Sequence, residues 1–228
     1  GFSIVSYTGN ETNNATVGHG LGKSPDWIIV KDRDTNSAGN NWYVFHSALA
    51  SGHYVKLNAT SATAALSGTS NGGVGSVTST TFNFVQGTSG NNKNVNESGD
   101  NFIAYCWTAI PGFSAFGSYT GNGSDDGPYV HLGFKAAWIM FKLVDGGNDD
   151  WPVYDIKRDP INVCDHRLFA NTATEEGAVG QEHFDILSNG IKFRKQKNPF
   201  NNSGAEYVYF AFAEQSGFTP FDTSTNAK

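Results

Sequence analysis

Two tryptophans that follow pairs of polar residues give the clearest chemical signal in the sequence. Trp42 follows two asparagines, and Trp151 follows two aspartates. A sugar ring presents C–H groups on one face and hydroxyls around its rim, so an exposed indole beside amides or carboxylates can bind it. His46 and Asp155 end the same two segments, and Arg158 is close enough in sequence to pair with Asp155. We name these five residues as candidate ligand-binding residues, while core packing is the favoured interpretation of both tryptophans because they recur with the fold.

Catalytic motifs are absent from the sequence. It contains no Gly-x-Ser-x-Gly, His-Glu-x-x-His, Walker or dinucleotide-binding pattern. Asp125-Asp126 and Asp149-Asp150 are adjacent acids in turn-like segments, whereas glycosidic hydrolysis needs two carboxyl groups that face each other about 5–9 Å apart. We therefore predict that the chain is not an enzyme and needs no cofactor, and a depolymerising glycosidase is the remote alternative.

The sequence also gives only weak evidence of a metal site. His19 and His131 occupy nearly equivalent places in a repeat described below, but no second ligand accompanies either one. The oxygen-rich stretch from Asn122 to Asp126 could hold Ca²⁺, which prefers flexible loop oxygens. We predict no metal site and leave calcium near Asp125 and Asp126 open.

Composition narrows the class of protein. The 228 residues carry a net charge of −6, with 16% charged and 14% aromatic residues and 27 glycines, which is typical of many short strands joined by tight turns. A basic face for nucleic acid is missing, and no apolar run reaches the roughly 18–20 residues that span a bilayer. We expect neither nucleic-acid binding nor membrane insertion. Cys106 and Cys164 occupy non-equivalent places, so buried fillers are favoured over a disulfide.

An internal repeat sets the organisation of the chain. The stretch Val95–Phe113 aligns without a gap on Phe200–Phe218, and Gly112–Asn122 aligns on Gly1–Asn10 with one inserted residue. These matches define two copies of a unit of about 105 to 111 residues. We assign residues 1–111 to the first copy, 112–216 to the second, and 217–228 to a tail or the start of a third. The chain is expected to be a piece of a longer protein.

Strand signals dominate both copies, and no stretch has sustained helical periodicity. The runs Ile28–Val30 and Ile139–Phe141 are continuously apolar, which predicts strands buried on both faces. Ser67–Ser79 is rich in Gly, Ser and Thr and predicts a long loop or an irregular edge. We predict an all-β fold of two tandem, pseudo-symmetric antiparallel β-sandwich repeats of jelly-roll or concanavalin-like type. The alternative is one concanavalin-like sandwich in which each repeat forms half.

Several motifs together carry a family resemblance: GFSxxSYTGN, HGLGKSPDWIIVK, WxVx(H/D), RDPxNxxDxRLFANT and FIAYCW. They are similar to a repeat found in large structural proteins of tailed bacteriophages, particularly aquatic and cyanobacterial ones, and the similarity extends through Phe218. The sequence departs from the commoner form at Glu11–Asn14 and Ser67–Ser79. The family has no assigned active residues, so no site is transferred.

The resemblance implies a virion-exposed tail-fibre or spike module, assembled in the host cytoplasm and acting outside the cell on the virion surface. Host adhesion through binding of cell-surface polysaccharide is the expected function, because clustered β modules turn weak sugar contacts into avidity. The alternative is a purely structural shaft, collar or capsid-decoration module. Other virion proteins are the expected partners, together with further copies of the chain in a homo-oligomer, a trimer if it is a fibre.

Overall fold

The fold was taken from a computed structural model, which describes residues 1–34, 41–68, 72–90, 92–145, 147–178, 183–195 and 200–214. Asn40 and the segment 217–228 lie outside the described residues. The chain forms antiparallel sheets, two with six strands and two with three, and this confirms the predicted all-β sandwich class.

The first half contains nine strands among its described residues. They are β1 (Phe2–Thr8), β2 (Thr16–Gly18), β3 (Trp27–Asp32), β4 (Trp42–His46), β5 (His53–Lys56), β6 (Ala64–Ala65), β7 (Gly73–Val77), β8 (Thr81–Val85) and β9 (Asn101–Trp107). A 3-10 turn (Leu66–Gly68) and the one-turn helix α1 (Lys93–Asn96) complete this half.

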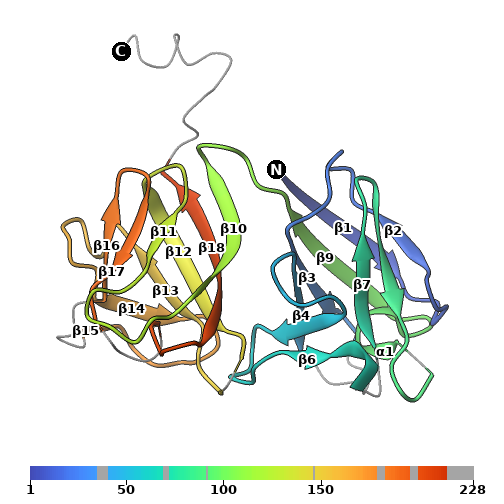
Figure 1. Cartoon of the computed structure of the whole chain (residues 1–228). Coiled ribbons are helices and arrows are strands. Elements are labelled where there is room, and N and C mark those ends of the chain that lie inside the picture. The colour runs from blue at the N-terminus through green and yellow to red at the C-terminus, as the bar shows by residue number, and fades with distance from the viewer. Residues whose placement is uncertain are drawn as a thin grey trace, which may run out of the picture.

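The described residues of the second half also form nine strands. They are β10 (Ser114–Thr120), β11 (Tyr129–His131), β12 (Ala136–Leu143), β13 (Pro152–Asp155), β14 (His166–Phe169), β15 (Gly177–Ala178), β16 (Phe184–Leu187), β17 (Gly190–Phe193) and β18 (Glu206–Ala213). The large sheets run β1-β9-β3-β4-β5-β6 and β10-β18-β12-β13-β14-β15, and the small sheets run β2-β8-β7 and β11-β17-β16. The strand order of the second half therefore matches that of the first, and the two halves lie side by side (Figure 1).

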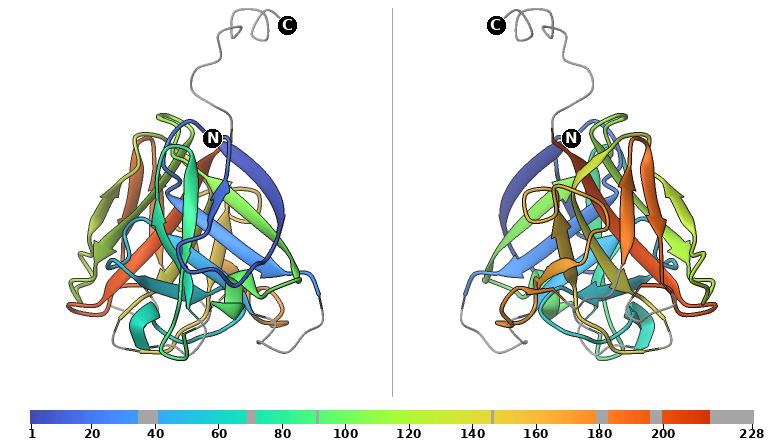
Figure 2. Two further views of the ribbon diagram at one scale, coloured as in Figure 1. Left: turned by 90° about the vertical axis from the view of Figure 1, so that its right-hand side faces the viewer. Right: turned by 90° about the vertical axis from the view of Figure 1, so that its left-hand side faces the viewer.

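Each half is a sandwich of its own, because each has a core between its large and small sheets. In the first half, Ile28 and Val30 of β3 pack with residues of β8 and β9. In the second, Ile139 and Phe141 of β12 pack with residues of β16 and β17. The repeats therefore form two sandwiches rather than two halves of one, and these lie one behind the other in the end views (Figure 2).

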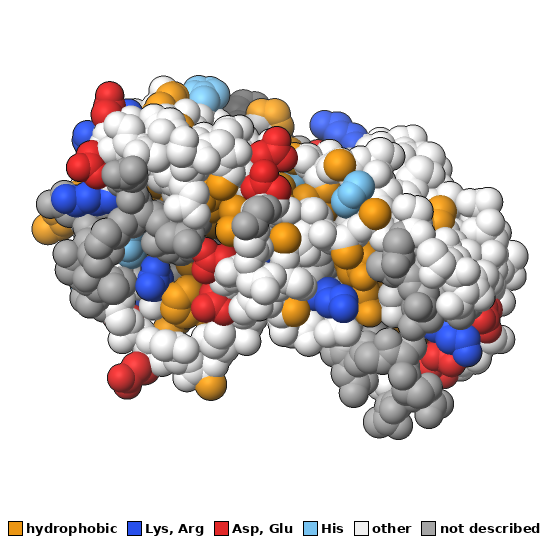
Figure 3. Space-filling view, turned by 60° about the horizontal axis from the view of Figure 1, so that its bottom comes forward, with side chains coloured by type: hydrophobic (Ala, Val, Ile, Leu, Met, Phe, Trp, Pro, Cys, Tyr) orange, Lys and Arg blue, Asp and Glu red, His pale blue; other side chains and the backbone are white. Residues whose placement is uncertain are grey.

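A third apolar cluster joins the two sandwiches. Trp27 and Ile29 alternate with the core residues of β3 and point to the other face of the sheet, where they pack with Met140 and Phe210 of the second half. Strands β3 and β12 are therefore buried on both faces, as their continuous apolar runs predicted. At the lower face of the molecule, apolar side chains reach the surface between scattered charged ones (Figure 3).

The repeated sequence motif closes the end of each sandwich. In the first half, the Gly9 N–H donates to Asp100 O, the Gly99 N–H donates to Gly9 O, and the Asn10 N–H donates to the Asn96 side chain. A Cβ on Gly9 would lie 2.0 Å from the Glu97 carbonyl oxygen, so only glycine fits this approach.

The second half repeats this clasp with its own copy of the motif. The Gly121 N–H donates to Ala205 O, and the Asn122 N–H donates to the Asn201 side chain. A Cβ on Gly121 would lie 2.2 Å from Asn202 O. The motif residues that reveal the repeat are therefore structural, since they tie the first strand of each half to the loop before its last strand.

Irregularity is concentrated where the sequence predicted it. Strand β7 falls within Ser67–Ser79 and is the edge strand of its sheet, with a register shift between Val74 and Val77. The other marked difference between the halves is the connection after β4 and β13. It spans residues 47–52 in the first half and 156–165 in the second.

We predict that Gly9→Ala lowers the free energy of unfolding by about 1–3 kcal/mol, because the added methyl group overlaps a backbone carbonyl that cannot move freely. Urea denaturation followed by tryptophan fluorescence measures the change. Gly18→Ala is the matched control, since its Cβ would approach nothing closer than Thr80 O at 3.8 Å. Equal stability of the two variants would contradict this account of the clasp.

Candidate functional site

Trp42 and Trp151 begin equivalent segments and are held in the same way. The Trp42 N–H donates to Asn58 Oδ1 at 2.9 Å, and Asn58 Nδ2 donates to Asn41 Oδ1 at 3.2 Å. The second half repeats both contacts through Trp151, Asn171 and Asp150. The polar residues beside each tryptophan, which suggested sugar binding, thus fix the start of β4 and of the segment that leads into β13.

The environments of the two indole rings differ. Trp151 is fully buried, and its Nε1 donates to two carbonyls of the first half, Lys56 O at 3.0 Å and Ala59 O at 3.1 Å. Its ring offers no face to a sugar, which agrees with core packing and not with ligand binding at this position. Trp42 is only half-buried and lies near Tyr105, with ring centroids 6.5 Å apart and planes inclined by 24°. An aromatic face beside side-chain amides therefore exists in the first half alone.

His46 is also buried in the junction and is not available to a ligand. Its Nδ1 accepts from the Ala48 N–H at 3.1 Å, so Nε2 carries the proton and donates to Tyr209 O of the second half at 3.3 Å. Burial lowers the pKa of His46 from 6.5 to about 4, although the bond to Tyr209 acts in the opposite direction. The imidazole is therefore neutral at pH 7 and serves to connect the two halves.

Lys142 is a buried cation at this junction, which sequence reasoning missed. Its Nζ donates to Thr60 O at 2.9 Å and to Asp149 O at 3.0 Å, and it lies 5.9 Å from the centre of the Trp151 ring. Burial lowers the pKa of Lys142 to about 8, and the charges of Asp149 and Asp150 oppose that shift. The only sequence signal was a lysine directly after the apolar run of β12.

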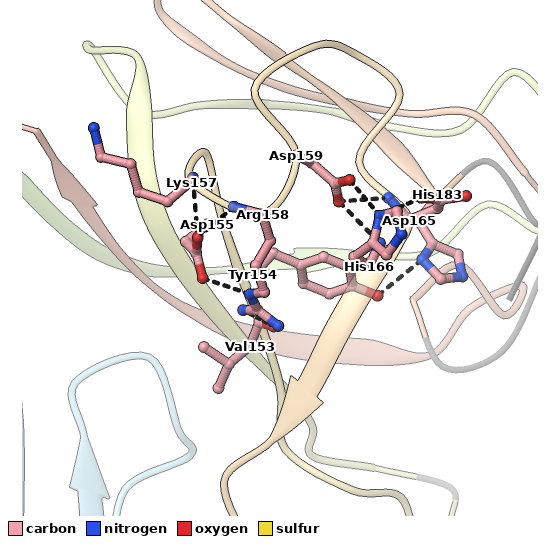
Figure 4. A network of polar contacts seen from close by, with 9 residues as sticks. All are labelled: Val153, Tyr154, Asp155, Lys157, Arg158, Asp159, Asp165, His166 and His183. Atoms are coloured by element: carbon pink, nitrogen blue, oxygen red, sulfur yellow. Dashed lines mark hydrogen bonds and ion pairs between the residues drawn. The ribbon is translucent and has the colours of Figure 1, made fainter. Parts of the chain in front are cut away.

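Asp155 and Arg158 form the expected ion pair at the end of β13 (Figure 4). Arg158 Nε lies 2.6 Å from Asp155 Oδ2, and a terminal nitrogen of Arg158 donates to Val153 O at 2.9 Å. Partial burial raises the pKa of Asp155, but the hydrogen bonds and charge of Arg158 outweigh it, so this pKa lies below its usual value. Both side chains of the pair are largely enclosed, with 25% of Asp155 and 13% of Arg158 exposed.

Next to this pair lies a His–Asp cluster that the sequence analysis did not identify. The ligand atoms of Asp159, Asp165 and His166 all lie within 4.8 Å of one another, a donor set that can hold a divalent cation. Asp159 also accepts from the backbone N–H groups of Asp165 and His166, and its Oδ1 lies 2.5 Å from His166 Nδ1. The hydrogen bond from Asp159 raises the pKa of His166. In this arrangement the cluster fastens the loop before β14, and its signal was the acid-rich run that precedes His166.

A second histidine closes the inner side of the same region. His183 Nδ1 lies 2.9 Å from the Tyr154 hydroxyl, and both side chains are buried (Figure 4). Burial lowers the pKa of His183 to about 4, and the nearby Arg167 acts in the same direction. This neutral histidine packs against Phe200, so it is part of the core of the second half.

The loop considered for calcium is held by its own polar groups. Asp126 is 87% exposed, and its Oδ1 lies 2.6 Å from Lys192 Nζ. The Ser124 N–H donates to Asn122 Oδ1, and the Asn122 side chain donates to Asp126 O. Asp126 is therefore paired with Lys192, and calcium binding at this loop stays an open expectation.

The geometry described above can be compared with known proteins. A family model described as domain of unknown function DUF7483 matches residues 1–216. The chain belongs to this family. The DUF7483 match covers both sandwiches but assigns no function, and it does not connect the chain with tailed-phage proteins, so that resemblance stays a prediction.

No curated protein and no solved structure matches the chain. Among the described residues, no helix has the length and apolar character needed to cross a membrane.

We predict that Trp151→Ala lowers the free energy of unfolding by about 3–5 kcal/mol, since it empties a buried site and leaves two carbonyls without their donor. Trp42→Ala is the matched control at the equivalent position, and it should cost less than half as much because Trp42 is half-buried. Urea denaturation of both variants measures the difference. Equal losses would contradict the distinct environments of the two rings.

Acid should weaken the junction through His46. Unfolding returns its pKa to near 6.5, so between about pH 6.5 and 4 the unfolded chain binds a proton that the folded chain does not. Stability therefore falls as pH is lowered through this window, by at most about 1.4 kcal/mol per pH unit for this group.

In His46→Gln, the loss of stability between pH 7 and pH 5, measured by urea denaturation, should be smaller than in the natural sequence. His131→Gln is the matched control, because it makes the same change at an exposed position of the second half. An unaltered pH dependence in His46→Gln would show that another group carries the effect.

Proposed function

We propose that this chain is a structural module of a tailed-phage virion appendage, in which two β-sandwiches form one stiff unit on the virion surface. The observation that carries the proposal is the burial of Trp151 and His46 in the junction. The side chains that best suited ligand binding hold the two halves together instead. The virion location rests on the family resemblance of the sequence motifs.

The junction has the character of a permanent interface. Its apolar core includes Trp27, Val44, Val55, Met140 and Phe210, all with little or no exposed surface. Hydrogen bonds between the halves accompany this core, and an extensive apolar interface resists bending between domains. A shaft, collar or decoration module requires this stiffness, because it must hold its neighbours at a fixed distance.

Host-surface polysaccharide binding is the second candidate, and the exposed part of Trp42 favours it. Trp42, Tyr105 and the side chains of Asn41 and Asn58 combine aromatic surface with amide hydrogen-bonding groups. One such site would bind weakly, and a trimeric or otherwise multivalent appendage would convert weak contacts into avidity.

Antibodies raised against the purified chain test the location. Immunogold electron microscopy of virions from a phage that encodes it should label an appendage or the capsid surface. Absence of label on intact virions, with a positive signal from denatured virions as the control for antibody quality, would place the module inside the particle and overturn the surface assignment.

Retention of the fluorescently labelled chain on host cells and on their extracted polysaccharide separates the two candidate functions. For a structural module, we expect no saturable retention even when the chain is clustered on a multivalent carrier. Saturable retention that Trp42→Ala abolishes, and that Gly18→Ala preserves, would instead establish the adhesion function and locate its site.

A further inference from the structure

The outer edge of β7 in the first half is an unpaired strand edge. Strand β7 ends its sheet, and no other described strand pairs with that side. The Phe84 N–H donates to Ala15 O, and Phe84 O accepts from the Asn14 N–H, so both groups point toward the β2 side of β8. Val74 pairs with Phe84 and is therefore not hydrogen-bonded to β8. Its backbone N–H and C=O point away from β8, toward the open edge. Thr78 and Thr81 do bond to each other, so the adjacent Val77 also directs its backbone outward.

Open space lies along this edge. Two clefts of about 510 Å³ and 250 Å³ share four lining residues, Ser51 and Gly52 on one wall and Gly75 and Ser76 on β7. A Cβ on Gly75 would lie 2.6 Å from Asn83 Oδ1, so the glycine allows the Asn83 side chain to lie close over β7. The larger cleft continues over the outer face of β8, where Asn83 and Val85 line it, and the smaller cleft runs beside Val77 of β7.

The second half shows what fills the equivalent place. Its edge strand β16 corresponds to β7 in the strand order, and the longer connection 156–165 lies against it. The Cys164 N–H donates to Phe184 O at 2.9 Å. The Asn162 side chain donates to Ile186 O at 3.0 Å and accepts from the Ile186 N–H at 2.9 Å. A bent segment of the same chain therefore covers that edge, with one backbone bond from Cys164 and a two-way side-chain contact from Asn162.

We propose that the groove beside β7 is a docking site for a short polypeptide segment from another protein, which pairs with the open edge as Asn162 and Cys164 pair with β16. The shorter connection 47–52 leaves the groove open, and the bonds made by Asn162 and Cys164 define the chemistry of the occupant. The occupant carries a side-chain amide that donates to the C=O and accepts from the N–H of one edge residue. It also carries a small residue whose backbone N–H donates to the edge. Its two anchors lie one residue further apart than on β16, because of the bulge between Val74 and Val77.

Nuclear magnetic resonance with the ¹⁵N-labelled whole chain tests the proposal. The probes are the peptide Asp-Pro-Ile-Asn-Val-Ala-Asp, which copies residues 159–165 with alanine for cysteine, and a version with one alanine inserted after the valine. We expect saturable shifts of the Gly52, Gly75 and Val77 amide signals and none at Ile186, whose edge is already paired. The absence of shifts with either peptide at millimolar concentration would overturn the proposal and leave the bulge as a device that protects the edge from pairing.

Backbone methylation separates strand addition from other modes of binding. Methylating the nitrogen of the alanine that replaces Cys164 removes the donor to the edge and should weaken binding by about three- to tenfold. The same peptide methylated at the nitrogen of the isoleucine, which copies the 80% exposed Ile161, is the matched control and should bind normally. Equal affinity of the two would rule out strand addition.

A variant of the protein gives an independent measurement. Val77→Pro removes an outward N–H that β8 does not use, and it should weaken the peptide by a similar factor. The methylated peptides keep the proposal testable if this variant fails to fold. Shifts of the same signals by host polysaccharide and not by peptide would assign the groove to sugar instead.

Discussion

The junction between the two sandwiches buries polar groups that are costly to remove from water unless they keep a hydrogen-bond partner. Three of them keep one, whereas the buried Trp27 indole N–H has none among the described residues. Trp151 buries its whole ring because Lys56 O and Ala59 O accept from its indole N–H. Lys142 and His46 obey the same rule through backbone carbonyls. With these polar groups satisfied, the outer faces of β3 and β12 can bury their apolar residues against the opposite half.

The two halves share a strand order and a clasp, yet they use equivalent residues differently. Trp42 and Trp151 are fixed by the same backbone bond to an asparagine, but Trp151 is fully buried and donates to the neighbouring sandwich, whereas Trp42 packs half-buried against the junction cluster. The connections after β4 and β13 also differ, since the longer one, after β13, covers the edge of its own small sheet. The second half is thus closed by its own residues and by the first, while the first keeps an aromatic patch and an open edge.

The predicted site was partly recovered by the structure. Asp155 and Arg158 do pair, because three residues within one turn bring their side chains together. His46 and Trp151 do not join a common surface, and the cluster of Asp159, Asp165 and His166 lay unrecognised in an acid-rich loop. Local spacing reveals a contact within a turn, whereas the burial of a strand end depends on what a distant part of the chain places over it.

The sequence by itself determined the all-β class, the positions of the doubly buried strands and the residues of the clasp. Those features follow from local alternation, from runs of apolar residues and from glycines that recur where backbones touch. Only the tertiary structure decided that the two repeats form separate sandwiches with a shared apolar junction, and which tryptophan remains accessible. These outcomes depend on the packing of one whole sheet against another, and the face that a strand presents does not specify which partner will cover it.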